Sequence, residues 1–309
     1  MYIDNYIDHL LNVAVAYTAR KAGKKVKDLQ EPEITAAMVA ELPDLLNRMV
    51  WPYSGISFGG CFIHKKPKAH YSITSGKNAC REVGDVLVVC RQKIDGVESF
   101  NATLLQMKMH KLSSDLHKIT DSSELEQLEL YQNWPNFYCR RNKKDTFFDI
   151  YPKAPHPGAQ YGLIRNVYGS DIEVYHSTSS KEMNLISDQS FGHFISDFVS
   201  LQNGRTITKR AQQSKDEWSR LIWYLLDISW LGAYRLSSIG HDNHLMISGD
   251  FFNLCNLMYS VNTEDQIKKM LIDGEVVEFN DEEEGISLFL IDVDENADRY
   301  YSEYRRRLF

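Results

Sequence analysis

Three polar side chains lie in or beside apolar runs that are typical of buried strands. Asp85 immediately precedes the apolar run at 86–90, and Gln106 and Lys108 interrupt a second apolar run at 102–109. Polar groups in buried strands cost free energy unless they are paired, so their coincidence indicates a function. A carboxylate, an amide oxygen and an ammonium group are suited to phosphodiester hydrolysis with a divalent cation.

The two runs are expected to be neighbouring antiparallel strands, because Asp95-Gly96 between them is a hairpin signal. Side chains alternate across a strand, so Asp85 shares a face with Leu87, and Gln106 shares a face with Lys108. The pattern therefore predicts that Asp85 lies close to Gln106 and Lys108 at one end of a sheet.

This arrangement predicts a catalytic role for Asp85, Gln106 and Lys108. Asp85 and Gln106 are predicted ligands of Mg²⁺ or Mn²⁺, a cation that polarises the phosphate and lowers the pKa of a bound water. Lys108 can position that water or offset the negative charge that develops in the transition state.

The strand that follows Asp85, the turn and the Gln106-Met107-Lys108 segment together resemble the PD-(D/E)XK nuclease superfamily, which has the restriction-endonuclease-like fold. The resemblance covers about half of the chain. It implies an α/β protein with an αβββαβ core and a mixed central sheet. Asp85 would be its metal-binding acid and Gln106-x-Lys108 its (D/E)XK strand. Most members have Asp or Glu where this chain has Gln106, and Gly84 replaces the usual proline.

The resemblance also implies an acidic residue in the first helix of the core. Glu41 is the best match, and Glu33 and Asp44 are lesser candidates. Glu82, three residues before Asp85, is a further candidate, either as a metal ligand or as a group that orients one.

The remaining elements are predicted from periodicity and from helix-capping residues. Pro43 is expected to kink its helix or to mark a restart, and Ser122 is expected to cap another. Helices are predicted over 5–22, 35–49, 122–133, 191–201 and 216–234, with less certain ones at 251–260 and after Thr263. Strands are predicted over 55–63, 83–90, 102–109, 146–151, 160–166, 172–175 and 286–293. Residues 69–73 are expected to continue the strand at 55–63 after a basic turn.

The change in periodicity along the chain predicts two regions. Residues 1–185 are expected to form the nuclease-like domain with its N-terminal helices. Residues 186–309 are expected to form a mainly helical C-terminal region with an acidic segment and a late strand.

Charge is unevenly distributed, although the chain as a whole carries −7. Residues 61–120 have a local balance of +5, and residues 261–298 have one of −11. Lys65, Lys66, Lys68 and Lys77 are candidates for contacts with nucleic-acid phosphates; a solvated basic turn is the alternative. The acidic segment is predicted to be a solvated surface or a brake on nucleic-acid binding. Asp292-x-Asp294 within it could bind a metal, but the adjacent acidic run favours a solvated end.

Cysteine usage and hydropathy indicate a cytoplasmic protein. The five cysteines are widely spaced and form no CxxC motif, so neither a disulfide framework nor a thiolate zinc site is expected. No secretory leader is evident, and no apolar window is long enough to span a bilayer.

Two functions are compatible with these features. The first is a Mg²⁺-dependent endonuclease that hydrolyses DNA as the effector of a bacterial restriction or antiviral defence system. Its partners would be DNA, a protein of the same system and a second copy of the chain. The alternative is a catalytically inactive nuclease-fold subunit that binds nucleic acid or a partner protein.

Overall fold

The computed structural model describes residues 3–49, 55–63, 67–110, 116–141, 143–153, 158–167, 171–177, 184–186, 189–208, 216–238 and 285–294. These residues form an α/β fold built on a mixed sheet, as the sequence predicts. Within them, no helix combines the length and the apolar character of a transmembrane span.

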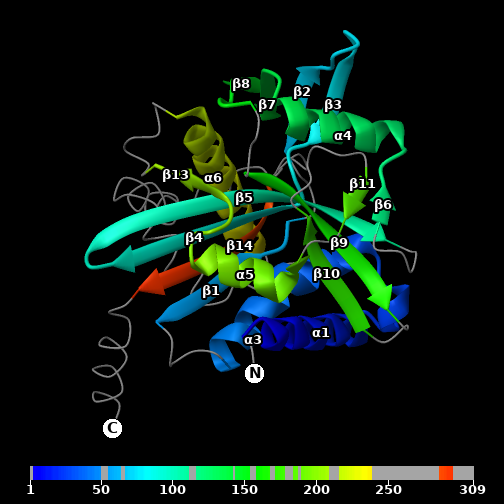
Figure 1. Ribbon diagram of the computed structural model, residues 1–309, viewed down its shortest axis with the longest axis vertical. Helices are drawn as coiled ribbons and strands as arrows, with labels where there is room; N and C mark the ends of the chain where they lie inside the picture. The colour runs from blue at the N-terminus through cyan, green and yellow to red at the C-terminus, as the bar shows by residue number, and fades with distance from the viewer. Residues whose placement is uncertain are drawn as a thin grey trace.

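The main sheet has eight strands among the described residues, in the order β1-β14-β4-β5-β9-β10-β12, with β13 paired to β5 (Figure 1). β4 is antiparallel to β5 and parallel to β14, and β5 is parallel to β9. The strands are β1 (Ile56–Cys61), β4 (Val86–Ile94), β5 (Val97–His110), β9 (Ala159–Val167), β10 (Asp171–Ser177), β12 (Gln189–Ser190), β13 (Arg205–Ile207) and β14 (Ser287–Asp294).

The hairpin predicted at Asp95-Gly96 joins β4 to β5 and is confirmed. Both turn residues have positive φ, 51° and 75°, as a tight hairpin turn requires. The pairing runs from Ile94 opposite Val97 to Val86 opposite Leu105. Because the turn fixes this register, it also fixes which residue lies opposite the start of β4.

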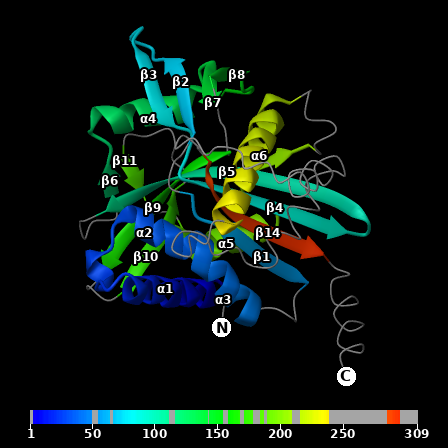
Figure 2. The same cartoon turned by 180° about the vertical axis from the view of Figure 1, so that it is seen from behind.

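Helices cover both faces of the main sheet (Figures 1 and 2). One face packs against α1, α2, α3 and α5, and the other against α4 and α6. The helices are α1 (Ile3–Lys21), η1 (Val26–Asp28), α2 (Glu31–Ala36), η2 (Ala37–Glu41), α3 (Leu42–Met49), α4 (Ser122–Asn133), α5 (Phe191–Val199) and α6 (Glu217–Ser238).

The helix predicted around Pro43 is continuous but contains a π turn. At η2 the Leu42 N–H donates to the Ala37 carbonyl, five residues earlier. Pro43 has no N–H for the Val39 carbonyl, and that carbonyl faces Gly60 of β1. A Cβ on Gly60 would lie 2.0 Å from the Val39 oxygen, so glycine allows β1 to approach this turn closely.

A second sheet corrects one prediction. Residues 69–73 were expected to continue the first strand, but β2 (Lys68–Ser72) belongs to a separate antiparallel sheet of order β3-β2-β7-β8. We call it the small sheet. Its other strands are β3 (Asn78–Glu82), β7 (Phe137–Arg141) and β8 (Lys144–Phe148), and a two-stranded pair joins β6 (Leu116–Lys118) to β11 (Asn184–Ile186).

The late strand predicted at 286–293 lies inside the main sheet as β14, between β1 and β4. The two regions divided at residue 185 therefore share one sheet, and α5 and α6 pack against strands of the first region. The expected helices at 251–260 and after Thr263, and most of the acidic segment, lie outside the described residues.

A buried ion pair holds β14 against β4. Arg91 donates two hydrogen bonds to the Asp292 carboxylate, at 2.7 and 2.6 Å, from directly opposite register positions. Arg91 is only 2% exposed and Asp292 13%. Asp292 was expected at a solvated acidic end, so this expectation is wrong; burial raises the pKa of its carboxyl, and Arg91 opposes that rise.

Removing one partner of this pair should destabilise the fold. Asp292→Ala leaves the Arg91 charge buried, so we expect the free energy of unfolding to fall by about 3–5 kcal/mol. Asp294→Ala is the matched control, because its ion pair with the more exposed Lys93 spans 3.7 Å; a loss of about 1 kcal/mol or less is expected there. Urea denaturation measures both, and equal losses would contradict the structural role of the Arg91–Asp292 pair.

Candidate active site

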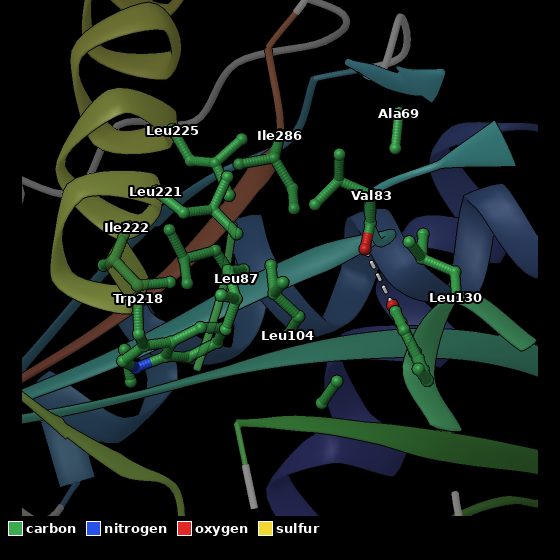
Figure 3. Close-up of a cluster of buried hydrophobic side chains, with 14 of the residues drawn as sticks. Ala69, Val83, Leu87, Leu104, Leu130, Trp218, Leu221, Ile222, Leu225 and Ile286 are labelled. Carbon is green, nitrogen blue, oxygen red and sulfur yellow. Dashed lines mark hydrogen bonds between the residues drawn. The ribbon is translucent and has the colours of Figure 1, made fainter. Parts of the chain in front are cut away.

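Three backbone contacts fix the segment that enters β4. The Val83 N–H donates to the Pro67 carbonyl at 2.9 Å, and the Asp85 N–H donates to the Leu105 carbonyl at 2.8 Å. The buried Tyr131 hydroxyl donates to the Val83 carbonyl at 2.8 Å, the dashed line in Figure 3. This segment therefore holds the Asp85 carboxyl group at a defined place beside β5.

Figure 3 shows the apolar cluster on the face of the main sheet that α6 covers. Leu87 and Leu104 lie opposite Trp218, Leu221 and Ile222 of α6. Because α6 buries this face, the residues of β4 and β5 that follow or precede the Asp85–Gln106 contact on it are apolar. Leu87 is two residues from Asp85, so strand alternation predicts that both side chains lie on this face.

The Asp85 carboxylate contacts Gln106, as the sequence predicts. Its Oδ2 accepts a hydrogen bond from the Gln106 side-chain amide and a second, at 2.6 Å, from the Met107 N–H. Asp85 is 2% exposed and Gln106 6%. A buried carboxylate and a buried amide are thus held together across β4 and β5.

Lys108 lies two residues beyond Gln106 and pairs with α4. Its Nζ is 3.3 Å from Oε1 of Glu124, in the first turn of that helix. Asp121, not the expected Ser122, caps α4 by accepting from the Ser123 N–H at 2.7 Å. The cap fixes where α4 begins, and hence where Glu124 meets Lys108.

His117 lies on the other side of Glu124, with Nε2 3.9 Å from Oε1. Its ring packs edge-on against His110, with ring centroids 5.5 Å apart. Burial lowers the pKa of His117; Glu124 opposes this shift, whereas His110 and Lys108 reinforce it. The polar cluster therefore extends from Asp85 along β5 to two histidines.

Two buried oxygens of neighbouring residues on β5 and β9 have no hydrogen-bond partner among the described residues. They are Oε1 of Gln106 and the hydroxyl of Tyr161. Tyr161 lies directly opposite Gln106 on β9, so the two side chains share a face. Buried polar atoms are normally satisfied, so these two oxygens can accept a hydrogen bond or, in the case of Gln106 Oε1, bind an ion.

Sequence reasoning did not identify Tyr161 or Glu124 as neighbours of the site. Both meet β5 through the crossover from β5 through α4 to β9, which no local pattern specifies. Burial raises the pKa of Tyr161, and the charge of Glu124 adds to the rise. Burial also raises the pKa of Tyr131, to which the charges of Asp85 and Glu82 contribute.

The acids predicted on the first helix are paired elsewhere. Glu41 forms an ion pair with Lys21 of α1 at 3.1 Å. The two lesser candidates pair with Lys24 and Arg48, respectively. The acid that reaches β5 is instead Glu31, at the start of α2, whose Oε2 accepts from the Met109 N–H at 3.2 Å.

The predicted phosphate contacts lie on or near the small sheet. Lys68 is exposed on β2, and Lys77 is exposed in the turn before β3. Lys65 and Lys66 lie outside the described residues. Glu82 ends β3 opposite Lys68.

The donor set suits a hard cation that retains water. Among the described residues, no group of three or more His, Cys, Asp or Glu side chains is placed to hold a metal. Mg²⁺ nevertheless often binds through one or two protein carboxylates, with waters and substrate phosphate completing its shell. One Asp85 carboxylate and the unpartnered Gln106 oxygen fit that pattern.

Comparisons of the chain with protein-family models, curated proteins and solved structures found no match. The contacts of Asp85, Gln106 and Lys108 therefore carry the functional argument. They place a buried carboxylate, an amide and a paired ammonium group along one face of β4 and β5.

Substitution of Asp85 should separate hydrogen bonding from charge. Asp85→Asn can still accept from Met107, and a rotated Gln106 amide can accept from the new side chain, so stability should stay within about 1 kcal/mol of the wild type. Asp85→Ala leaves both donors unpaired and should cost about 1–3 kcal/mol. Urea denaturation measures both, with exposed Asp28→Ala as the control. Equal stabilities of the Asn and Ala variants would contradict this account.

Proposed function

We propose that this protein is a metal-dependent nuclease that hydrolyses phosphodiester bonds of DNA. The observation that carries the proposal is the contact between the buried Asp85 carboxylate and Gln106, with Lys108 on the same face of β5. A structural role alone does not require three polar groups at the buried end of a strand pair.

The arrangement of strands supports the same proposal. β4 and β5 form an antiparallel hairpin, α4 follows, and β9 returns parallel to β5. This order is similar to part of the restriction-endonuclease-like αβββαβ core. The insertion of β14 between β1 and β4 is a departure from the order that the resemblance implies.

Asp85 and Gln106 would hold the Mg²⁺ or Mn²⁺ ion of the proposed enzyme. When bound, such an ion polarises the phosphate and lowers the pKa of its water. Rotation of the Gln106 amide would turn Oε1 toward the ion and remove the N–H donors from Asp85. Lys108, held by Glu124, would offset the charge that develops on the phosphate oxygens.

We propose a cytoplasmic effector of a bacterial restriction or antiviral defence system, with DNA as its substrate. A protein of the same system is the proposed partner that controls its activity.

Cleavage of supercoiled plasmid DNA tests the proposed activity. We expect nicking or linearisation with Mg²⁺ and a loss of at least about 100-fold in rate for Asp85→Asn and Lys108→Ala. Lys27→Ala, which removes an exposed lysine, is the control. Wild-type cleavage that persists in both variants would exclude this site as the catalytic centre.

A specific contact favours the second candidate, an inactive nuclease-fold subunit. The Gln106 amide and the Met107 N–H both donate to Oδ2 of Asp85, so this carboxylate oxygen is satisfied without an ion. A neutral side chain at 106 also brings one negative charge fewer to a cation than an acid would. Under this alternative the site is a relic, and the protein binds nucleic acid or a partner protein.

Gln106→Glu distinguishes the two candidates. Two adjacent buried carboxylates repel each other, so this variant should be less stable than the wild type in chelator and should regain stability with Mg²⁺. Mg²⁺ should also bind it more tightly in a calorimetric titration. Exposed Gln202→Glu is the control. If the wild type and both variants bind no Mg²⁺ and cleave no plasmid, the inactive-subunit alternative is favoured.

A further inference from the structure

The small sheet presents a row of aromatic side chains on the face that points away from the core. His70 of β2, Tyr138 of β7 and Phe147 of β8 lie directly opposite one another across three neighbouring strands. The His70 and Tyr138 rings stack 4.9 Å apart at 8°, and Tyr138 and Phe147 lie 5.4 Å apart. We call these three side chains the aromatic row.

Packing does not account for the aromatic row. The opposite face of the small sheet already contributes Tyr71, Phe137 and Phe148 to the core. Phe147 is 64% exposed, and His70 and Tyr138 are half-buried. Figure 1 shows the small sheet at the top of the molecule, remote from α1 and α3. A partly exposed row of aromatic rings is characteristic of a binding surface.

The small sheet also carries an excess of basic residues, and its two acids lie opposite cations, Glu82 opposite Lys68 and Asp145 opposite Arg140. Its strands and their turns, residues 68–82 and 137–148, carry seven Lys and Arg against two acids. Arg140 lies over the Tyr138 ring at 5.4 Å and donates two hydrogen bonds to Asp145. The basic residues are Lys68, Lys77, Arg81, Arg140, Arg141, Lys143 and Lys144, and the acids are Glu82 and Asp145.

A cavity of about 780 Å³ adjoins the aromatic row. Its lining includes all three rings, the amides of Asn78 and Asn136, and the charged groups of Asp149, Glu217 and Arg220. Arg220 pairs with Glu217 at 2.7 Å, so the cavity itself is not basic. Burial lowers the pKa of His70; Arg140 and Lys68 reinforce this shift, and Asp145 opposes it. A lowered pKa favours the neutral imidazole, which offers an uncharged aromatic face.

We propose that this face binds single-stranded nucleic acid, with bases stacked on the aromatic row and phosphates held by the surrounding cations. Base faces stack on aromatic side chains irrespective of sequence, and a basic surround attracts the backbone. A paired duplex keeps its bases stacked inside and cannot use the rings in this way. The proposal extends the proposed nuclease function, because it names unpaired strands as the nucleic acid recognised, but the binding does not need Asp85.

The test is fluorescence anisotropy of the full-length protein with a labelled 20-nucleotide oligo-dT in chelator, which prevents metal-dependent cleavage. We expect Phe147→Ala and Tyr138→Ala each to weaken binding about fivefold or more. Tyr138→Phe, which retains the ring, should bind like the wild type. Tyr151→Ala removes a tyrosine that is 75% exposed and lies outside the aromatic row, so it is the matched control.

Two further probes separate stacking from charge. An abasic strand with the same number of phosphates should bind at least about fivefold more weakly than oligo-dT. Lys68→Ala should lessen the salt dependence of affinity, with a slope change of about 0.7, whereas Phe147→Ala should leave the slope unchanged.

The outcomes are distinguishable from those of the cleavage assay. The proposal would be overturned if the protein bound the abasic strand as tightly as oligo-dT. It would also be overturned if Phe147→Ala and Tyr138→Ala both bound oligo-dT with wild-type affinity. Either result would leave a surface that binds by charge alone. Oligo-dT binding without plasmid cleavage would support this proposal and count against the nuclease. Plasmid cleavage without oligo-dT binding would support the nuclease and count against the single-strand binding proposed here.

Discussion

The fold and its candidate site both depend on the pairing of β4 with β5. The two-residue turn at Asp95-Gly96 sets the register, and nine residue pairs later that register brings Asp85 beside Gln106. A slip of one residue would move Gln106 and Lys108 to the opposite face, toward α1 and α5. The same hairpin therefore fixes the core packing and the position of the carboxylate.

Local patterns in the sequence were sufficient to predict this hairpin and the contact it creates. Alternation placed Asp85 and Gln106 on one face, and the structure joins them by a hydrogen bond. The helix at 122–133 was predicted with the bounds that the structure gives it, because an acidic first turn and an apolar stripe are local signals. The expected cap at Ser122 was wrong because Asp121, one residue earlier, accepts the hydrogen bond.

Long-range pairings could not be predicted in this way. β14 pairs with β4, although about two hundred residues separate them in the sequence. The residues of each strand do not specify which other strand lies beside it. For the same reason residues 69–73 were expected to continue the strand at 55–63, whereas β2 pairs with β3 and β7 in a separate sheet. Glu124 and Tyr161 reach the site through the β5–α4–β9 crossover. That helix also contacts the small sheet, where Arg81 meets Glu126 at 2.6 Å, so α4 connects the candidate active site to the aromatic row.

The most direct test of the central claim is a crystal structure determined with Mn²⁺, recorded at a wavelength where manganese scatters anomalously. The account predicts an anomalous peak bound by an Asp85 oxygen at about 2.1–2.2 Å, with the Gln106 amide rotated so that Oε1 faces the ion. The same crystal form of Asp85→Asn should lack the peak. Density in which Asp85 and Gln106 remain hydrogen-bonded at saturating Mn²⁺, with no peak beside them, would contradict the metal-dependent nuclease.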